Sequence, residues 1–190
     1  MGLMFYTATS ANPDTSNWDV SSVIDISQMF LGASSANPDT LNWNVSSVTD
    51  MYQMFRNASS ANPDTSSWDV SSVTNMSQMF RNASSANPDT LNWNVSSVID
   101  MSIMFYNATS ANPNTSNWDV SSVTDMYRMF ESANLSIENL TAIYENWSQL
   151  TLKQNVSFSA GTTKYNSSGQ AGRDILINTY NWSITDGGQV

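Results

Sequence analysis

The sequence contains no cysteine and no histidine. The first absence excludes a disulfide framework and a thiolate metal site, and the second removes the commonest general base and transition-metal ligand. Basic residues are also few, since acidic residues outnumber them 16 to 6. Because the chain has no basic cluster that could displace counterions from phosphates, we expect no nucleic-acid partner.

Long hydrophobic runs are missing as well. No apolar stretch approaches the roughly 18 residues of a membrane helix, so we expect no membrane span, and no signal-peptide pattern opens the chain. A hydrophobic content of 40 % over 190 residues is still enough to form a core. Met4-Phe5 occupies the position that Met29-Phe30 holds in the next unit, so the chain begins inside a repeat and we expect a fragment of a larger protein.

The dominant feature that is present is an internal repeat with a period of about 25 residues. Met-Phe pairs keep this period, at 4–5, 29–30, 54–55, 79–80, 104–105 and 129–130. Tryptophan keeps it too, at Trp18, Trp43, Trp68, Trp93 and Trp118. Short units that recur at a fixed period predict a solenoid, in which each unit packs against its neighbours.

Each unit contains an apolar pattern typical of a helix. Val48, Met51, Met54, Phe55 and Ala58 fall at i, i+3, i+6, i+7 and i+10, along one face of a helix. The pattern predicts a helix of roughly eight to ten residues that depends on its neighbours for stability.

Both ends of this helix carry signals. Ser47 and Asp50 approximate a capping box at its start, and the same pair recurs as Ser22/Asp25, Ser97/Asp100 and Ser122/Asp125. A left-handed C-terminal cap is expected at the other end, because glycine and asparagine tolerate positive φ best. The residues at that position are Gly32, Asn57, Asn82 and Asn107.

The rest of each unit predicts a turn and a strand. The motif Asn-Pro-Asp, first seen at 12–14, fits a tight turn. In the extended segment that follows, Trp18 and Val20 point to one side and Asn17 and Asp19 to the other. These elements predict an α/β repeat solenoid, a right-handed coil with a parallel sheet on one face and short helices on the other. About five units cover residues 1–133, and residues 134–190 form a C-terminal capping segment continuous with them.

The stretch WDVSSVTDMYRMF at 118–130, followed by Ser132-Ala133, resembles the repeat of BspA-like bacterial surface proteins, a family related to leucine-rich repeats. The match extends in register over about residues 3–133. The resemblance implies a leucine-rich-repeat-like coil in a secreted, extracellular or cell-surface protein. It also implies attachment or recognition without catalysis, and it does not name the partner. We expect a protein or carbohydrate ligand, and no cofactor apart from the calcium considered below.

The tail resembles the closing segment of such arrays. It contains a helix within 134–152, a strand within 155–165, a second helix within 167–180 and a last strand within 181–188.

Two polar rows of the expected sheet point away from the core and form what we call the polar panel. It is weakly acidic, and it lies on the surface that solenoids commonly use for binding. Alternation of Asp with Asn keeps carboxylates two rungs, about 9–10 Å, apart. We take the panel as the candidate ligand-binding face, with a purely solvated surface as the alternative. Its members are Asn17, Asp19, Asn42, Asn44, Ser67, Asp69, Asn92, Asn94, Asn117 and Asp119.

A second acidic row lies in the turns and consists of Asp14, Asp39, Asp64 and Asp89. Carboxylates stacked about 5 Å apart would attract a hard cation such as calcium. Alternatively, each carboxylate accepts backbone N–H bonds within its own turn. We favour the second interpretation, because the spacing does not provide the six to eight oxygen ligands that calcium takes.

Ranks of hydroxyl and amide side chains raise a different hypothesis, an ice-binding protein. The candidate ranks are Thr15 to Thr115 and the Ser-Ala stretches at 34–36, 59–61 and 84–86. Catalysis has the least support, because no nucleophile–base pair and no phosphate-binding glycine loop is visible.

A few positions of the otherwise uniform helix segment vary between units, among them Arg56, Arg81, Tyr127 and Arg128. Such variation could encode ligand specificity, and neutral drift explains it equally well.

Overall fold

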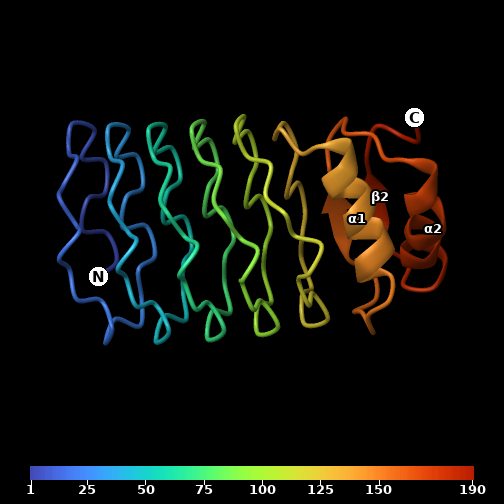
Figure 1. The fold of residues 1–190 in the computed structure, drawn as a ribbon, viewed down its shortest axis with the longest axis horizontal. Helices are drawn as coiled ribbons and strands as arrows, with labels where there is room; N and C mark the ends of the chain where they lie inside the picture. Colours follow the sequence, from blue (N-terminus) through green and yellow to red (C-terminus); the bar gives the residue numbers. More distant parts are fainter.

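The computed structural model describes residues 1–190. Coils of 25 residues lie side by side along the long axis of the molecule, and the helices gather at the C-terminal end (Figure 1). The regular elements are α1 (Ile137–Trp147), β1 (Ser157–Ser159), the 3-10 helix η1 (Ser167–Gly169), α2 (Gln170–Asn178) and β2 (Ser183–Thr185). None of the helices combines the length and the apolar character that a membrane span requires. Residues 1–133, which we call the coil array, consist of turns, irregular segments and isolated bridges.

Most backbone hydrogen bonds between coils come from one segment, residues 50–58 and their equivalents, which we call the ladder segment. Single bonds flank it, from Thr49 N to Ile24 O at 2.8 Å and from Ser60 N to Ser34 O at 3.1 Å. Alternate N–H groups donate to the following coil, as Met51 N does to Asn75 O at 3.0 Å. Parallel bridges recur at a constant register, through Asp25, Asp50, Asn75, Asp100 and Asp125. Each coil is therefore fixed to its neighbour by main-chain bonds.

The helix expected in the ladder segment does not form. N–H groups that do not reach the next coil close tight turns, such as Met54 N to Met51 O at 3.2 Å. Gln53 and Asn57 have left-handed backbone conformations, with φ of 55° and 60°, which an α-helix does not accommodate. Turns that advance by three residues bring the same apolar positions inward as a helix would. The spacing alone could not distinguish the two structures.

The left-handed positions themselves were predicted correctly. Gly32, Asn57, Asn82 and Asn107 have φ of 74°, 60°, 58° and 55°. They serve as turn residues between bonds to adjacent coils rather than as helix caps.

The strand expected at the tryptophan segment is also absent. Trp43 and Val45 are buried and Asn42 and Asn44 exposed, as the alternation predicts. Main-chain bonds here are local, however, as in Trp43 N to Thr40 O at 3.0 Å. Tight turns on both sides of the tryptophan leave no stretch long enough for a backbone ladder.

Side chains take over the connection between coils in the tryptophan segment. The Thr40 hydroxyl donates to Asp64 O at 2.6 Å, and the Trp68 indole donates to Thr40 O at 3.3 Å. The same pair of bonds recurs along the array, so every buried indole nitrogen of this row from Trp43 onward has an acceptor.

Two aromatic columns fill the core of the array. From Phe30 to Phe130, successive phenylalanine rings lie 5.4 or 5.5 Å apart at angles of at most 8°. From Trp18 to Trp118, successive indoles lie 6.0–6.4 Å apart, also at angles of at most 8°. Valine, methionine and alanine at the other inward positions are almost fully buried.

Residues 134–190, which we call the cap, continue the ladder with different elements. A parallel bridge joins Met126 to Phe158 in β1, and β1 pairs in parallel with β2. Both helices and both strands lie within the stretches expected for them. Helix α1 starts at the N-cap Ser136, whose side chain accepts from Asn139 N at 3.2 Å. It buries Leu140, Ile143, Tyr144 and Trp147.

Helix α1 occupies the position that the tryptophan segment holds in the coils. The Trp147 indole donates to Thr115 O at 3.0 Å, as the Trp118 indole does to Thr90 O at 3.3 Å. The cap is thus stacked on the array through the same acceptor.

Candidate ligand-binding surfaces

The outer row of the polar panel consists of exposed side chains: Asn17, Asn42, Ser67, Asn92 and Asn117. Three of them, Asn42, Asn92 and Asn117, form no side-chain hydrogen bond within the chain, whereas the Ser67 hydroxyl donates to Leu41 O at 2.8 Å. Each free amide offers both donors and an acceptor to solvent or to a ligand.

The inner row of the panel is exposed too, but its side chains also close turns of the fold. The row contains Asp19, Asn44, Asp69, Asn94 and Asp119. One oxygen of Asp19 accepts from the hydroxyl and the N–H of Ser21, at 2.6 and 3.0 Å. These bonds hold the pKa of the Asp19 carboxyl below its usual range. Asn44 closes the same turn with Ser46. The second oxygen of each carboxylate in the row forms no bond within the chain.

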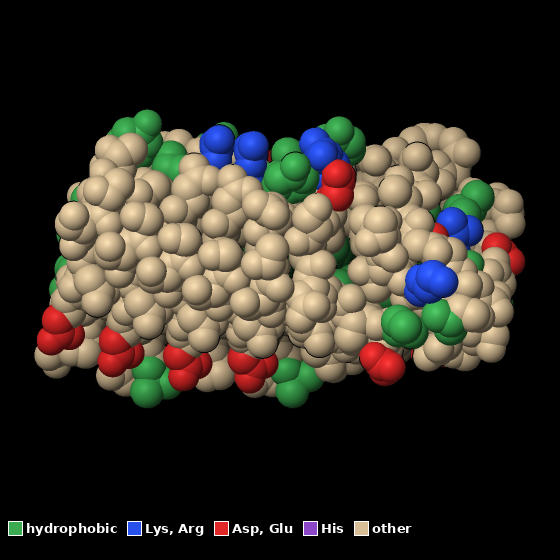
Figure 2. All heavy atoms as spheres, turned by 90° about the horizontal axis from the view of Figure 1, so that it is seen from above, with side chains coloured by type: hydrophobic (Ala, Val, Ile, Leu, Met, Phe, Trp, Pro, Cys, Tyr) green, Lys and Arg blue, Asp and Glu red, His purple; other side chains and the backbone are tan.

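In the turn row, each carboxylate accepts a backbone N–H bond within its own turn, as we favoured from the sequence. Asp14 and Asp64 accept from the serine two residues ahead, and Asp39 and Asp89 accept from Leu41 N and Leu91 N at 3.2 and 3.1 Å. No group of three or more acidic side chains converges on a point where a metal ion could bind. Acidic side chains stand singly at regular intervals along one edge of the array (Figure 2).

A third column of such turns includes the four aspartates that the sequence pattern assigned to helix capping boxes. It contains Asp25, Asp50, Asn75, Asp100 and Asp125, each accepting from the N–H two residues ahead at 2.7–3.0 Å. The asparagines before proline were expected only as turn residues, and their role in joining coils was not predicted. The side-chain oxygen of Asn37 accepts from Asn62 N, one coil later, at 2.8 Å, and this ladder reaches Ser136 N in the cap. Its signal was the invariance of Asn-Pro in every unit.

The threonine rank considered for ice binding is not on the surface. Thr15, Thr40, Thr65, Thr90 and Thr115 are buried. Four of the hydroxyls donate to a carbonyl of the next coil.

The positions that vary between units come together on the outer side of the ladder segment. We call this surface the arginine–tyrosine face and define it by Tyr52, Arg56, Arg81, Tyr106, Tyr127 and Arg128. The guanidinium of Arg128 lies 4.6 Å from the centre of the Tyr106 ring and pairs with Glu131, Nε to Oε2, at 2.6 Å. The same bonds from Arg128 hold the pKa of Glu131 below its usual range.

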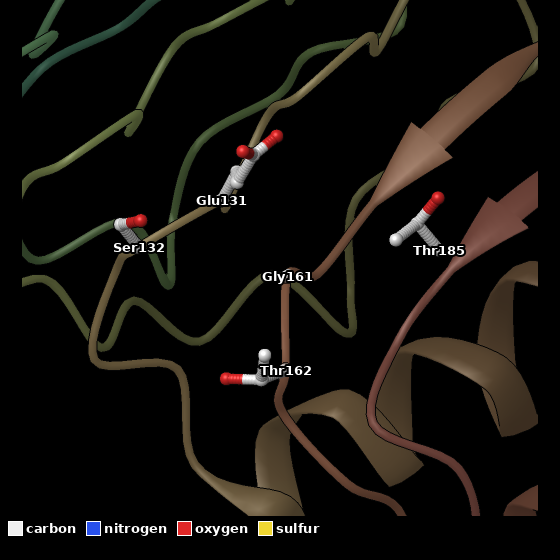
Figure 3. A pocket seen from close by; sticks show the side chains of 5 residues that line it. All are labelled: Glu131, Ser132, Gly161, Thr162 and Thr185. Atoms are coloured by element: carbon white, nitrogen blue, oxygen red, sulfur yellow. The ribbon is translucent and has the colours of Figure 1, made fainter.

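A cavity of about 310 Å³ opens where the array meets the cap. Its lining is Glu131, Ser132, Gly161, Thr162 and Thr185 (Figure 3). Glu131 is the one ionisable side chain in it, and both of its oxygens are engaged by Arg128. The cavity offers hydroxyls and a neutralised carboxylate.

The cap contains one buried ionic cluster. Asp186 Oδ2 accepts from the Tyr144 hydroxyl and from Arg173 Nε, each at 2.7 Å, and Oδ1 accepts from Gly188 N at 2.9 Å. Burial alone would raise the pKa of Asp186, but these three bonds outweigh it and hold the pKa below its usual range. Burial, reinforced by the bond to Asp186, raises the pKa of Tyr144. The cluster anchors α1 and α2 to the last segment of the chain.

Coils of one length, joined at every step by the same bonds, define a repeat protein. The family model described as "Mycoplasma protein of unknown function, DUF285" matches residues 1–90, 35–147 and 63–170. The chain belongs to this family. The three matches overlap and are displaced along the array, as expected when equivalent coils can each begin a match. Comparisons with curated proteins and with solved structures found no match.

Proposed function

We propose that the protein is a non-catalytic adhesion or ligand-binding module, located outside the cell or on its surface, that binds a protein or carbohydrate through the polar panel. The observation that carries this proposal is the row of exposed amides at Asn42, Asn92 and Asn117, which have no partner within the chain. Amides of this kind match the hydroxyls of sugars and the peptide groups of proteins. The resemblance of the repeat to BspA-like surface proteins supports the same function.

The constant register of the bonds, with partners 25 residues apart, supports a further part of the proposal, that the array is a right-handed solenoid related to leucine-rich repeats. The coils differ from the expected strand–helix unit in their local structure. The relation to leucine-rich repeats therefore rests on the period and on the inward apolar pattern.

The test is a screen of glycans and matrix proteins with the wild type and two panel variants. Asn42→Ala/Asn92→Ala/Asn117→Ala removes free amides that take no part in the fold. Asp19→Asn/Asp69→Asn/Asp119→Asn removes charge but keeps the turns, because Asn44 and Asn94 close the same turns. Gln189→Ala, an exposed amide in the cap, is the matched control. We expect the first variant to lose its ligand and the control to keep it. Unchanged binding in both panel variants would exclude the panel.

Ice binding is the second candidate function. Because the threonine rank from Thr15 to Thr115 is buried, the surface considered for it is a different, exposed row. Ile24, Thr49, Thr74, Ile99 and Thr124 are exposed, and each N–H from Thr49 onward donates to the carbonyl of the preceding member at 2.8–2.9 Å. The row is a regular rank of methyl and hydroxyl groups, and the hydroxyls of Thr49, Thr74 and Thr124 donate to the carbonyl of the preceding member at 3.2–3.4 Å. Purified protein at high concentration should then show thermal hysteresis, and its absence would end this proposal.

A further inference from the structure

All basic side chains of the coil array lie on the arginine–tyrosine face. They are Arg56, Arg81 and Arg128, and Figure 2 shows them along one edge of the array, across the molecule from the regularly spaced acidic side chains. The array thus gathers its three basic side chains on one face of a chain whose net charge is −10.

Two of these arginines have no charge partner. Arg128 pairs with Glu131, but Arg56 and Arg81 form no ion pair. The Nε atoms of Arg56 and Arg81 are buried without a hydrogen-bond partner, which is uncommon in folded proteins. Arg81 donates from Nη1 to Gln78 Oε1 at 3.0 Å, and Arg56 makes no side-chain bond. The fold supplies these two neighbouring cations with no acid.

An aromatic ring and an amide lie beside Arg81, the second of these cations. The Tyr106 ring lies between the guanidinium groups of Arg81 and Arg128, 5.7 and 4.6 Å from its centre, and Tyr127 is 49 % exposed. Beside them, the side-chain amide of Gln28 donates to Gln53 at 2.9 Å, and that of Gln53 donates to Gln78 at 3.1 Å. Two adjacent coils therefore present Arg56 and Arg81, and the next coil presents Tyr106 at the same position.

We propose that the arginine–tyrosine face binds a linear polysaccharide that carries carboxylates. The planar guanidinium matches a carboxylate with two parallel bonds. The exposed ring of Tyr127 offers a flat surface for a sugar ring. The half-buried amides of Gln28 and Gln78 offer polar groups for hydroxyls, whereas Gln53 between them is buried. Nucleic acid fits less well, because two unpaired cations release few counterions and the rest of the chain is acidic. This proposal goes beyond the function proposed above, since it uses a different face and a defined ligand class.

Calorimetric titration with alginate, a linear polyuronate, at low salt tests the proposal. Arg56→Gln/Arg81→Gln should weaken binding by about tenfold or more, and Tyr127→Ala by several-fold. The matched control is Lys153→Gln/Lys164→Gln, which removes the same charge from exposed positions of the cap. It should bind as the wild type does. Thermal melts of all variants check that they remain folded.

Four results would overturn the proposal. They are no binding of alginate by the wild type, unchanged binding in Arg56→Gln/Arg81→Gln, an equal loss in the lysine control, or tighter binding of neutral dextran, dextran sulfate, duplex DNA or phosphatidylserine vesicles. The panel variant Asn42→Ala/Asn92→Ala/Asn117→Ala should bind alginate normally. If the arginine variant binds normally while the panel variant loses its own ligand, this inference fails and the function proposed above stands.

Discussion

The coil array and the cap continue one ladder but build the opposite side of the coil differently. Main-chain bonds run from Met126 to Ser157 in β1 and from Ala160 to Thr185 in β2, as they run between coils. Opposite the ladder, however, the array has turns closed by asparagine and aspartate, whereas the cap has α1. The ladder therefore fixes how coils stack and leaves the remaining segment free to adopt whatever its sequence favours.

Local sequence explains this difference. Each coil carries Asn-Pro-Asp or, in one case, Asn-Pro-Asn, and proline cannot continue a helix whereas Asn and Asp favour turns. The segment of α1, IENLTAIYENW, contains good helix formers and no proline or glycine. The aromatic packing changes at the same boundary, because Phe158 meets Phe130 edge-on at 79° rather than stacking on it.

The largest loss of stability is expected from a substitution in the core of the coil array. Trp68→Ala removes an indole that is 2 % exposed and lies between two others. The cavity and the lost burial should lower the free energy of unfolding by about 3–5 kcal/mol. Urea denaturation followed by circular dichroism would measure it. Asn17→Ala, at an exposed position, should change stability by less than about 0.5 kcal/mol. A larger loss at Asn17 than at Trp68 would contradict the assignment of the inward face.

A comparable loss of stability is expected when the buried ionic cluster of the cap is broken. Asp186→Ala leaves Arg173 and the Tyr144 hydroxyl without their shared acceptor, and the side chains of Arg173 and Asp186 are 21 % and 4 % exposed. Loss of one partner of a buried pair should destabilise the cap by about 3 kcal/mol. Hydrogen exchange should then speed up in α1 and α2 before it does in the central coils. Equal acceleration throughout would mean that the cap and the array unfold as one unit.

Addition of a single methyl group to α2 should also destabilise the cap without disturbing the coil array. A Cβ at Gly172 in α2 would lie 2.1 Å from the carbonyl oxygen of Tyr144 in α1. Because that neighbour is backbone, the helices must separate, and Gly172→Ala should cost about 2 kcal/mol. Differential scanning calorimetry would measure the change. A melting temperature equal to that of the wild type would show that α1 and α2 can move apart freely.

How much the sequence could predict differs between the same two regions. The four elements of the cap lie where the resemblance to the closing segments of BspA-like arrays placed them. For α1 the local sequence agrees with the tertiary structure, since its segment contains no proline or glycine. In the coils, the inward residues, the left-handed asparagines and the turn role of Asp14 were also found. The local structure was wrong, because apolar residues three apart suit a helix and a series of tight turns equally well. The bonds that decide between them, such as Met51 to Asn75, join different coils and leave no local pattern.

Acid should weaken the array through its turn carboxylates. The bonds from the following serines hold the pKa of Asp14, Asp19, Asp64 and Asp69 below the ordinary value of 3.8. A lowered folded pKa contributes stability above the unfolded pKa, and this contribution is lost as pH falls through the folded pKa. We expect the urea midpoint to fall between about pH 5 and pH 2. Replacing the four residues by asparagine, which closes the same turn at Asn44, should flatten the decline. An equally steep decline would assign it to other groups, such as Asp186.

The smallest effect is expected from calcium. Each carboxylate of the turn row bonds within its own turn, so millimolar calcium should shift the melting temperature no more than sodium does at equal ionic strength. A calcium-specific rise, abolished by Asp39→Asn/Asp64→Asn, would show that ions bind between turns after all. Magnesium should then do less, because it prefers compact octahedral geometry.

The constant register between coils has a consequence for evolution. Every internal coil presents the same bonds to the coil before it and to the coil after it, at a step of 25 residues. Loss or gain of one unit in the gene would leave each interface chemically unchanged and alter the reach of the molecule by about 5 Å. Loss or gain of two units would also preserve the alternation of Asp19, Asn44 and Asp69. Lineages could therefore adjust how far the module extends in steps that do not compromise its folding.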